Sequence, residues 1–280
     1  MNYVLIDSLI KKALLEDRAY DDITTNSITS EESQAEVEVI VKEDGKICGL
    51  KVFSRVFQIL GDVEIKFLKK EGEIVNKGEL IAQLRGSTRV LLSGERVALN
   101  LLQRMSGIAT EAYKASEILK EHGIKVMDTR KTTPGLRYLE KYSVLTGGGF
   151  NHRFDLSDMA MIKDNHILAA GSIKKAVESI RKKHPFIKKI EVEAENLEHV
   201  KEGLEAGADI IMLDNMEDEL LKECVDYING RAIIEVSGNI DIERFQRLKG
   251  LKIDYISMGK LTHSVKALDI SMKNLKILKS

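Results

Sequence analysis

The chain has 280 residues, 43% of them hydrophobic and 31% charged, with two prolines. This is the profile of an ordered protein large enough for a barrel and a small domain, and we expect two domains. Lysine plus arginine (43) nearly cancel aspartate plus glutamate (44), tryptophan is absent, and aromatic residues make up 5%. These counts argue against nucleic acid or an anionic membrane as a partner, because they offer neither a global positive field nor stacking platforms.

The two cysteines, Cys48 and Cys224, lie far apart and have neither C-x-x-C nor His-rich spacing around them. They predict neither a disulfide framework nor a zinc site, and they fit a reducing compartment. Residues 1–18 lack the apolar core of a signal peptide, and no apolar run approaches the ~18 residues that span a bilayer. We therefore expect a cytoplasmic protein.

Residues 1–108 predict a small α+β domain. Apolar residues at helical spacing predict helices, and apolar residues that alternate with glutamates after Gln34 predict a half-buried strand. The polar, β-branched segment 21–25 is interpreted as a plain turn, with a ligand-contacting loop as the alternative. The predicted elements are helices over 5–15 and 50–60, strands over 34–41 and 63–68, and a short strand between turns at 71–73 and 76–79.

The segment 93–103 begins with Ser93, a good helix-capping residue, and continues with apolar residues at helical spacing. It predicts a helix that is a packed linker between two domains. In this interpretation Arg96 and Arg104 are surface cations. The alternative is that Arg96 projects into the anion site of a neighbouring subunit, which composition alone does not show.

From residue 110 onward, helices alternate with short strands that are almost wholly apolar. Such strands are buried on both faces, as parallel strands wrapped by helices are. The pattern predicts a β/α barrel with fewer than eight strands. Its predicted strands cover 124–128, 159–163, 189–193, 210–213, 232–236 and 255–258, and its helices cover 111–121, 173–184, 197–206, 217–228 and 240–248.

Polar residues follow the predicted strands of the barrel. The ligand site of a β/α barrel lies at the carboxyl ends of its strands, and this many polar ends on one rim indicate a ligand rather than ordinary capping. The stretch 128–167 combines cations with hydroxyls and open glycine backbone, which suits a small polyanion. The polar strand ends are Asp128-Thr129-Arg130-Lys131, Lys163-Asp164-Asn165-His166, Glu193, Asp214-Asn215, Ser237-Gly238-Asn239 and Gly259-Lys260.

The rim residues divide by charge. Glu193 and Asp214 suit a Mg²⁺ ion that keeps its waters, although both could instead cap the following helices. Ser237-Gly238 and Gly259 free backbone N–H groups for a phosphate, and His263 is either a further donor or a helix-surface residue. Arginine can grip carboxylate or phosphate with two bonds, whereas lysine acts as a point charge. The cations of the rim are Arg130, Lys131, His152, Arg153 and Lys163.

Several other chemistries lack support in the sequence. No G-x-x-x-x-G-K-[ST] loop is present, and the glycines at 147–149 do not join a clean strand to a helix as a dinucleotide fingerprint would. Ser157 and Ser237 lack a G-x-S-x-G setting, and Cys224 lies within a predicted helix. Catalysis by electrostatics and positioning remains.

A series of sequence blocks resembles quinolinate phosphoribosyltransferase, also called carboxylating nicotinate-nucleotide pyrophosphorylase, in order and over essentially the whole chain. The blocks are GERVALNLLQRMSGIAT (94–110), DTRKTTPGLRYLEKY (128–142), GGGFNHRFDLSDMAMIKDNH (147–166), IEVEAEN (190–196), IMLDN (211–215), EVSGNI (235–240) and ISMGKLTHS (256–264). The resemblance implies an N-terminal open-sandwich domain (1–108), an irregular, incomplete α/β barrel (109–270), and a C-terminal segment (271–280) that packs back on the first domain.

The same resemblance implies a homodimer, with a dimer-based hexamer left open, in which one subunit's N-terminal domain covers the other's barrel mouth. Quinolinate and phosphoribosyl pyrophosphate are the implied substrates, and Mg²⁺ is the implied cofactor. The implied reaction loses pyrophosphate from C1 of the ribose, joins C1 to the pyridine nitrogen and then releases CO₂, which gives nicotinate mononucleotide for NAD biosynthesis. No residue must act as a general base, because the attacking nitrogen carries no proton.

Residue roles carry over from the family to the matching positions. Glu193 and Asp214 would hold Mg²⁺ through water and contact the ribose hydroxyls, and Arg96 would reach quinolinate from the partner subunit. The implied catalytic residues are Lys131, Lys163, Glu193 and Asp214. The implied carboxylate-binding residues are Arg130, His152 and Arg153, with Lys131 and Lys163 between the two substrates, and the implied residues on the 5′-phosphate side are Ser237, Gly238, Gly259 and His263.

Two departures and two alternatives accompany the resemblance. Phe154-Asp155 and Asn239 stand where many relatives have a small residue, but neither change removes a charged group of the site. A paralogue of the same fold could act on another anionic ligand, against which the complete set of rim cations argues. A binding module for single-stranded nucleic acid is the alternative from another class, and the low aromatic content argues against it.

Overall fold

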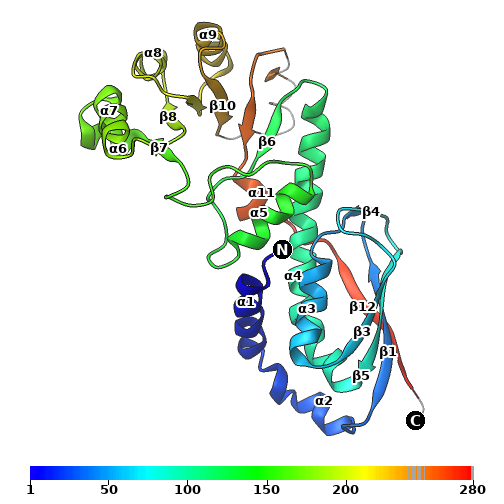
Figure 1. The fold of residues 1–280 in the computed structure, drawn as a ribbon. Coiled ribbons are helices and arrows are strands. Elements are labelled where there is room, and N and C mark those ends of the chain that lie inside the picture. Colours follow the sequence, from blue (N-terminus) through cyan, green and yellow to red (C-terminus); the bar gives the residue numbers. More distant parts are fainter. Residues whose placement is uncertain (239, 241–243, 245–246, 249, 279–280) are drawn as a thin grey trace. The chain divides into compact units, whose positions relative to one another are not determined.

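The protein is described by a computed structural model over residues 1–238, 240, 244, 247–248 and 250–278, and it divides into two compact units (Figure 1). One unit comprises Met1–Tyr113, Thr133–Gly148 and Ser264–Ser280, and the other comprises Lys114–Thr132 and Gly149–His263. The division predicted from the sequence, 1–108, 109–270 and 271–280, did not include a return of the chain to the first unit at Thr133–Gly148.

The first unit is built on a four-stranded antiparallel sheet in the order β12-β1-β5-β3 (Figure 1). Alternating exposed and buried side chains along β1 match its predicted pattern, because successive residues of a strand point to opposite faces. A second, two-stranded sheet joins β2 to β4. The strands are β1 (Gln34–Val41), β2 (Gly45–Lys46), β3 (Val63–Phe67), β4 (Ile74–Val75), β5 (Leu80–Ser87) and β12 (Ile270–Ile277).

Helices pack against the sheet of the first unit and complete its core. Phe53 and Phe57 of α3 are fully buried and meet edge to face, with ring centroids 5.2 Å apart. The predicted helices over 5–15 and 50–60 are confirmed by α1 and α3. The helices are α1 (Tyr3–Glu16), the 3-10 turn η1 (Ala19–Asp21), α2 (Ile23–Ile28), α3 (Leu50–Leu60), the first part of α4 (Thr88–Lys120) and α5 (Arg137–Thr146).

The plain turn predicted over 21–25 is wrong, because helix α2 begins there. Asp22 caps α2, with its Oδ1 accepting from the Thr25 backbone N–H at 3.0 Å and its Oδ2 accepting from the Thr25 hydroxyl at 2.5 Å. The two threonines lowered the helix expectation, yet an aspartate three residues before a hydrogen-bonding threonine is a strong N-cap signal.

The helix predicted over 93–103 is only the middle of α4, which runs without interruption over 33 residues from Thr88 to Lys120. Ser93 therefore does not cap it. Gly107, which lies between the predicted helices over 93–103 and 111–121, is required by packing: a Cβ there would lie 2.2 Å from the Lys266 carbonyl oxygen. Glycine is needed because another backbone segment crosses the helix at this point.

Arg104 is not the surface cation that the sequence suggested. Its Nε and Nη2 donate to Oε1 of Glu140 at 2.9 and 2.6 Å, and Nη2 also donates to the Thr133 hydroxyl at 2.7 Å. Glu140, on α5, is 1% exposed. The ion pair ties α4 to α5 inside the first unit, over a separation in sequence that no local pattern reveals.

Glu71→Ala is expected to lower the free energy of unfolding by about 1–2 kcal/mol. The Glu71 carboxylate accepts from the backbone N–H groups of Gly49 and Leu50 at 2.6 and 3.0 Å and so caps α3, whose own N-cap residue has no side chain. Urea unfolding measures the change. Glu73→Ala, which removes an exposed turn carboxylate two residues away, is the control; an equal loss in both variants would contradict the capping role.

The second unit is a six-stranded, wholly parallel sheet in the order β6-β11-β10-β9-β8-β7 with helices beside it (Figure 1). This confirms the predicted incomplete β/α barrel. Helix α6 of this unit was not predicted, and neither was α5 of the first unit. The strands are β6 (Lys125–Met127), β7 (Ala160–Ile162), β8 (Ile190–Ala194), β9 (Ile210–Asp214), β10 (Ile233–Ser237) and β11 (Tyr255–Ser257), and the helices are α6 (Asp164–Ala170), α7 (Ile173–Lys183), α8 (Leu197–Glu205), α9 (Asp218–Ile228) and α11 (Lys260–His263).

The helix predicted over 240–248 falls largely outside the residues that the structure describes, and so does Asn239. Over the described part of the chain, no helix has the length and apolar character needed to cross a membrane.

Candidate active site

The central strands of the second unit carry polar side chains on the face turned away from the helices. The opposite face is apolar: Val192 and Ile211 approach the position where Gly203 of α8 would carry a Cβ, at 3.6 and 2.9 Å. Because side chains alternate along a strand, the residues between these apolar positions share the other face. Along β8, β9 and β10 that face carries Glu191 and Glu193, Met212 and Asp214, and Glu235 and Ser237.

Lys163 and Glu193 come together at the carboxyl ends of β7 and β8. Lys163 Nζ forms an ion pair with Glu193 Oε2, so a predicted substrate-binding cation contacts a predicted magnesium ligand. The Lys163 backbone N–H donates to His166 Nδ1 at 3.0 Å and fixes the start of α6. The Lys163 side chain is 40% exposed, which leaves it accessible to a ligand at the rim.

The ends of β9 and β10 are joined through Asn215. Its backbone N–H donates to the Ser237 carbonyl at 3.1 Å, and its side-chain Nδ2 donates to Asp214 Oδ2 at 2.7 Å. Gly238 has φ +90°, and a Cβ there would lie 2.1 Å from Asn215 Oδ1. Glycine at position 238 is therefore required by its positive φ and by the nearby Asn215 side chain, whether or not a phosphate binds there.

Lys131, Gly259 and His263 form a second group of predicted residues that the structure brings together. A Cβ on Gly259 would lie 2.9 Å from Lys131 Cδ and 3.1 Å from His263 Cδ2. The Thr262 hydroxyl donates to the Lys131 carbonyl at 2.8 Å, which ties the loop after β6 to α11 after β11. The imidazole of His263 is exposed and so remains open to a ligand from solvent.

Arg130 and Arg153 place two positive charges near each other. Burial and the nearby charge of Arg130 lower the pKa of Arg153, whose side chain is 8% exposed. One of its nitrogens, Nη1, donates to the Met159 carbonyl at 3.0 Å. The Nε of Arg130 is buried and has no hydrogen-bond partner within the described ranges. Two guanidinium groups in mutual repulsion favour an anion between them.

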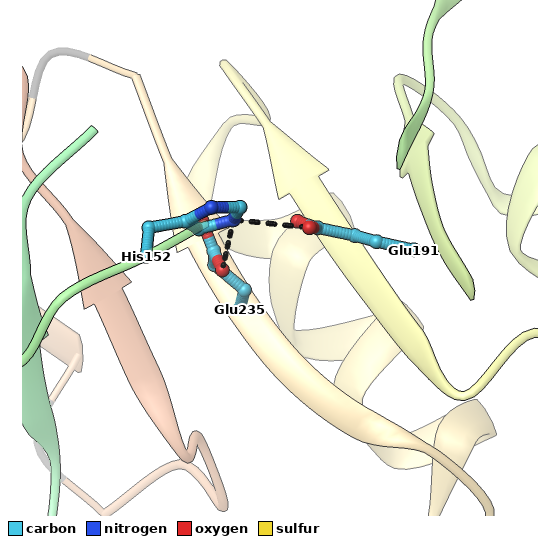
Figure 2. A group of neighbouring side chains, drawn as sticks. All are labelled: His152, Glu191 and Glu235. Atoms are coloured by element: carbon cyan, nitrogen blue, oxygen red, sulfur yellow. Dashed lines mark ion pairs between the residues drawn. The ribbon is translucent and has the colours of Figure 1, made fainter. Parts of the chain in front are cut away.

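His152 lies against two buried glutamates that the sequence analysis did not single out (Figure 2). Its Nε2 is 3.0 Å from Oε2 of Glu191 on β8 and 3.4 Å from Oε2 of Glu235 on β10. Glu191 and Glu235 are 0% and 1% exposed. The other ring nitrogen, Nδ1, accepts the backbone N–H of Arg153 at 2.7 Å. Both ring nitrogens therefore contact protein groups.

The protons of this cluster are shared among its members. Burial lowers the pKa of His152, but its contacts with Glu191 and then Glu235 outweigh burial and raise it to about 10. Burial raises the pKa of Glu191, against the effect of His152. Because Nδ1 accepts the Arg153 N–H, a ring proton lies on Nε2, which faces the two carboxylates.

The sequence does contain a pattern that points to Glu191 and Glu235. Each is a glutamate within a strand and has an apolar residue on both sides, in IEVEA and IIEVS. A carboxylate buried in a parallel sheet is costly unless it is paired or protonated. A charged residue at an inward position of such a strand is thus a site candidate even when it does not end the strand.

A cavity of about 710 Å³ opens beside His152 and Arg153, but it is not at the predicted rim. Its other lining residues, among them Met159 and Lys189, precede β7 and β8, so the cavity adjoins the amino ends of these strands. Most of the other predicted site residues, among them Lys163, Glu193 and Asp214, lie at the carboxyl ends of the strands instead. We place the candidate site by this convergence of charge, because volume alone does not identify a ligand site.

Arg96 belongs to the first unit, where it lies exposed on α4. The remaining predicted site residues all belong to the second unit. A single chain does not test the expected contact of Arg96 with a partner subunit, and that contact stays a prediction.

The chain matches known proteins along nearly its whole length. The family models of the N-terminal and C-terminal domains of quinolinate phosphoribosyl transferase match residues 22–106 and 108–273. The probable nicotinate-nucleotide pyrophosphorylase (carboxylating) of Bacillus subtilis is 46% identical over 273 residues, which cover 97% of this chain and 94% of that protein. The chloroplastic enzyme of the same name from Arabidopsis thaliana is 40% identical over 96% of this chain and 82% of its own length.

Solved structures agree with the sequence comparisons. The crystal structure of NadC from Streptococcus pyogenes has a TM-score of 0.95 and 48% identity, and the match covers 100% of this chain and 99% of that one. The nicotinate-nucleotide pyrophosphorylase of Francisella tularensis has a TM-score of 0.91 and 34% identity, over 99% and 98% of the two chains. This chain therefore belongs to the quinolinate phosphoribosyltransferase family.

Proposed function

We propose that this chain is a decarboxylating pentosyltransferase that transfers the phosphoribosyl group of phosphoribosyl pyrophosphate to quinolinate, with nicotinate mononucleotide, CO₂ and pyrophosphate as products. The observation that carries the proposal beyond family membership is the pair Arg130 and Arg153. Two guanidinium groups, one nearly buried and the other with a buried Nε that lacks a partner among the described residues, fit a ligand with two carboxylates, because guanidinium binds carboxylate in a planar, two-bond geometry.

Cations at the rim would bind the phosphorylated substrate beside quinolinate. Lys163 directly follows β7, and Lys131 lies in the loop after β6. Each lysine offers a point charge to an anion. Gly259 leaves room for Lys131 and His263 to approach each other, and these two with the backbone at Ser237 and Gly238 form the proposed 5′-phosphate side. The arrangement would hold C1 of the ribose against the pyridine nitrogen.

Glu193 and Asp214 would hold Mg²⁺ through water. They fit this ion because both offer carboxylate oxygens at the ends of adjacent strands, where a hydrated cation can also contact substrate phosphates. When bound there, Mg²⁺ supplies positive charge that neutralises the pyrophosphate. In the structure Glu193 contacts Lys163 and Asp214 accepts from Asn215, so both carboxylates are already oriented toward the rim.

The proposed reaction needs positioning and charge rather than a general base. The C1–O bond to pyrophosphate breaks, an oxocarbenium-like C1 forms, and the unprotonated pyridine nitrogen bonds to it. The C2 carboxylate then leaves as CO₂, the electron pair left on C2 is stabilised by the positive ring nitrogen created in the first step, and C2 takes up a proton from water. Lys131 and Lys163 would stabilise the departing pyrophosphate, and Arg130 and Arg153 would hold the pyridine ring in position.

The proposed assembly is a homodimer in the cytoplasm. Arg96, exposed on α4, would reach the quinolinate of the partner subunit, and the sheet unit of each chain would cover the other's strand ends. Pairing of dimers into a hexamer remains compatible with this arrangement.

The test of the proposed function is a direct assay of both products. Quinolinate and phosphoribosyl pyrophosphate with Mg²⁺ are expected to give equal amounts of CO₂ and pyrophosphate, and a chelator is expected to abolish both. Arg130→Ala is expected to lose turnover while keeping the wild-type thermal midpoint within a few degrees. Turnover with nicotinate in place of quinolinate, and none with quinolinate, would overturn the assignment.

A further inference from the structure

The buried cluster of His152, Glu191 and Glu235 lies beside the proposed carboxylate site but does not belong to it by contact. Glu191 and Glu235 stand on β8 and β10, with β9 between them, so their two strands are separated by roughly 9.5 Å. The imidazole bridges that gap at 3.0 and 3.4 Å (Figure 2). Both carboxylates are almost wholly buried, which places them beyond direct reach of a ligand at the rim.

The imidazole is held on every side by groups that fix its orientation. Its Nε2 faces the two carboxylates, and its Nδ1 accepts the Arg153 backbone N–H at 2.7 Å. The His152 backbone N–H donates to Oδ1 of Asp128, which is 0% exposed, at 2.9 Å. The hydrogen bond to Nδ1 leaves the ring proton on Nε2, which lies within ion-pair distance of both carboxylates.

The contacts that begin at the two glutamates end at one functional group, the guanidinium of Arg153. His152 fixes the peptide N–H of Arg153, and the Arg153 guanidinium is held a second time by the Met159 carbonyl at 3.0 Å. These two contacts restrain Arg153 at its backbone and at its guanidinium. A bidentate grip on a carboxylate tolerates only small displacements, so loosening the backbone contact would weaken it.

We propose that Glu191 and Glu235 are positioning residues for the dicarboxylate: their close contacts with Nε2 hold the His152 ring in place, and His152 in turn holds Arg153 in its binding position. The inference rests on the proposed function for the identity of the ligand. The direct contact of His152 with a substrate carboxylate stays a prediction, to which this proposal adds a second role through Arg153.

A metal ion between the same three side chains is the competing assignment, since their ligand atoms lie within 4.8 Å of one another. The separation of 3.0 Å between His152 Nε2 and Glu191 Oε2 fits a direct N–H to oxygen contact and also two ligands of one ion. Metal content therefore belongs among the tests.

Steady-state kinetics with each substrate varied in turn test the positioning role. Glu191→Met and Glu235→Met remove an acceptor at similar volume and are expected to raise KM for quinolinate on the order of 10- to 100-fold, with KM for phosphoribosyl pyrophosphate within about twofold of wild type. Glu235→Gln keeps an acceptor and is expected to retain most of the wild-type KM. Met212→Leu, a volume-conserving change on the same face of β9, is the matched control and is expected to change neither KM.

A double-mutant cycle shows whether the glutamate acts through Arg153. On an Arg153→Ala background, Glu235→Met is expected to cause little further rise in KM for quinolinate, because the group that it positions is already gone. A full additional rise would overturn the proposal. So would one tightly held metal ion per wild-type chain that is lost in Glu235→Gln.

A measurement independent of turnover separates this inference from the proposed function. Long-range ¹H–¹⁵N spectra of the wild-type protein, with His152 assigned by comparison with His152→Asn, are expected to show a protonated Nε2 and an unprotonated Nδ1 at neutral pH. A protonated Nδ1 would overturn the positioning chain even if quinolinate is turned over. The expected tautomer without quinolinate turnover would instead fault the proposed substrate. Because the tautomer is measured on the wild-type protein, the result does not depend on whether the glutamate variants fold.

Discussion

Lys163→Met is expected to lower kcat/KM for phosphoribosyl transfer about 100- to 1,000-fold, while the protein folds normally. Lys163 supplies a positive charge at the end of β7, where both proposed substrates are anionic. Its Nζ forms an ion pair with Glu193, yet its side chain is 40% exposed, so a ligand can reach it. Removing the charge leaves the Glu193 carboxylate, only 11% exposed, to face the substrates without its partner.

The measurement is pyrophosphate release at varied concentrations of each substrate. Lys182→Met is the matched control, because Lys182 is an exposed lysine in the last turn of α7, and it is expected to stay within about twofold of wild type. Lys163→Met/Glu193→Gln is expected to lose less than the product of the two single losses, since contacting residues act as a unit. A Lys163→Met enzyme within tenfold of wild type would rule out this role for the lysine charge.

The parallel strands of the second unit could be predicted because their signal is local. Each is a short apolar run followed by a polar residue, and parallel strands in one sheet bring such ends to a common edge. The contact of Lys163 with Glu193 follows from that rule alone, because β7 and β8 are neighbours. The meeting of Lys131 with His263 does not, since it also depends on the absence of a side chain at Gly259.

Contacts between residues far apart in the sequence could not be predicted. Glu191 and Glu235 find their common partner, His152, at positions 39 and 83 residues earlier in the chain, and only that partner makes their burial tolerable. The continuity of α4 was hidden in a similar way. Gly107 reads as a break in any local window, and the reason for it is a carbonyl that comes from residue 266.

Arg104→Met is expected to lower the free energy of unfolding by about 3–5 kcal/mol. Glu140, at 1% exposed, accepts from Arg104 at 2.9 and 2.6 Å through Oε1 and from the Thr133 backbone N–H at 3.1 Å through Oε2. Without the guanidinium, a buried carboxylate keeps its backbone donor but loses its charge partner. Burying a charge without such compensation costs several kcal/mol, whereas the lost pair itself would cost less.

The double variant Arg104→Met/Glu140→Leu separates these two costs in urea unfolding. It is expected to recover most of the loss, because replacing both members of a buried ion pair by apolar groups is often neutral or better. Arg89→Met is the control on the same helix: the Arg89 side chain is 28% exposed, much like the 29% of Arg104, but it pairs with a glutamate, Glu31, that is 82% exposed. That variant is expected to lose about 1 kcal/mol, since a partner left in water keeps its solvation. Equal losses for Arg104→Met and Arg89→Met would show that the burial of Glu140 contributes nothing, and the stability of the α4–α5 contact would then have to come from its apolar packing.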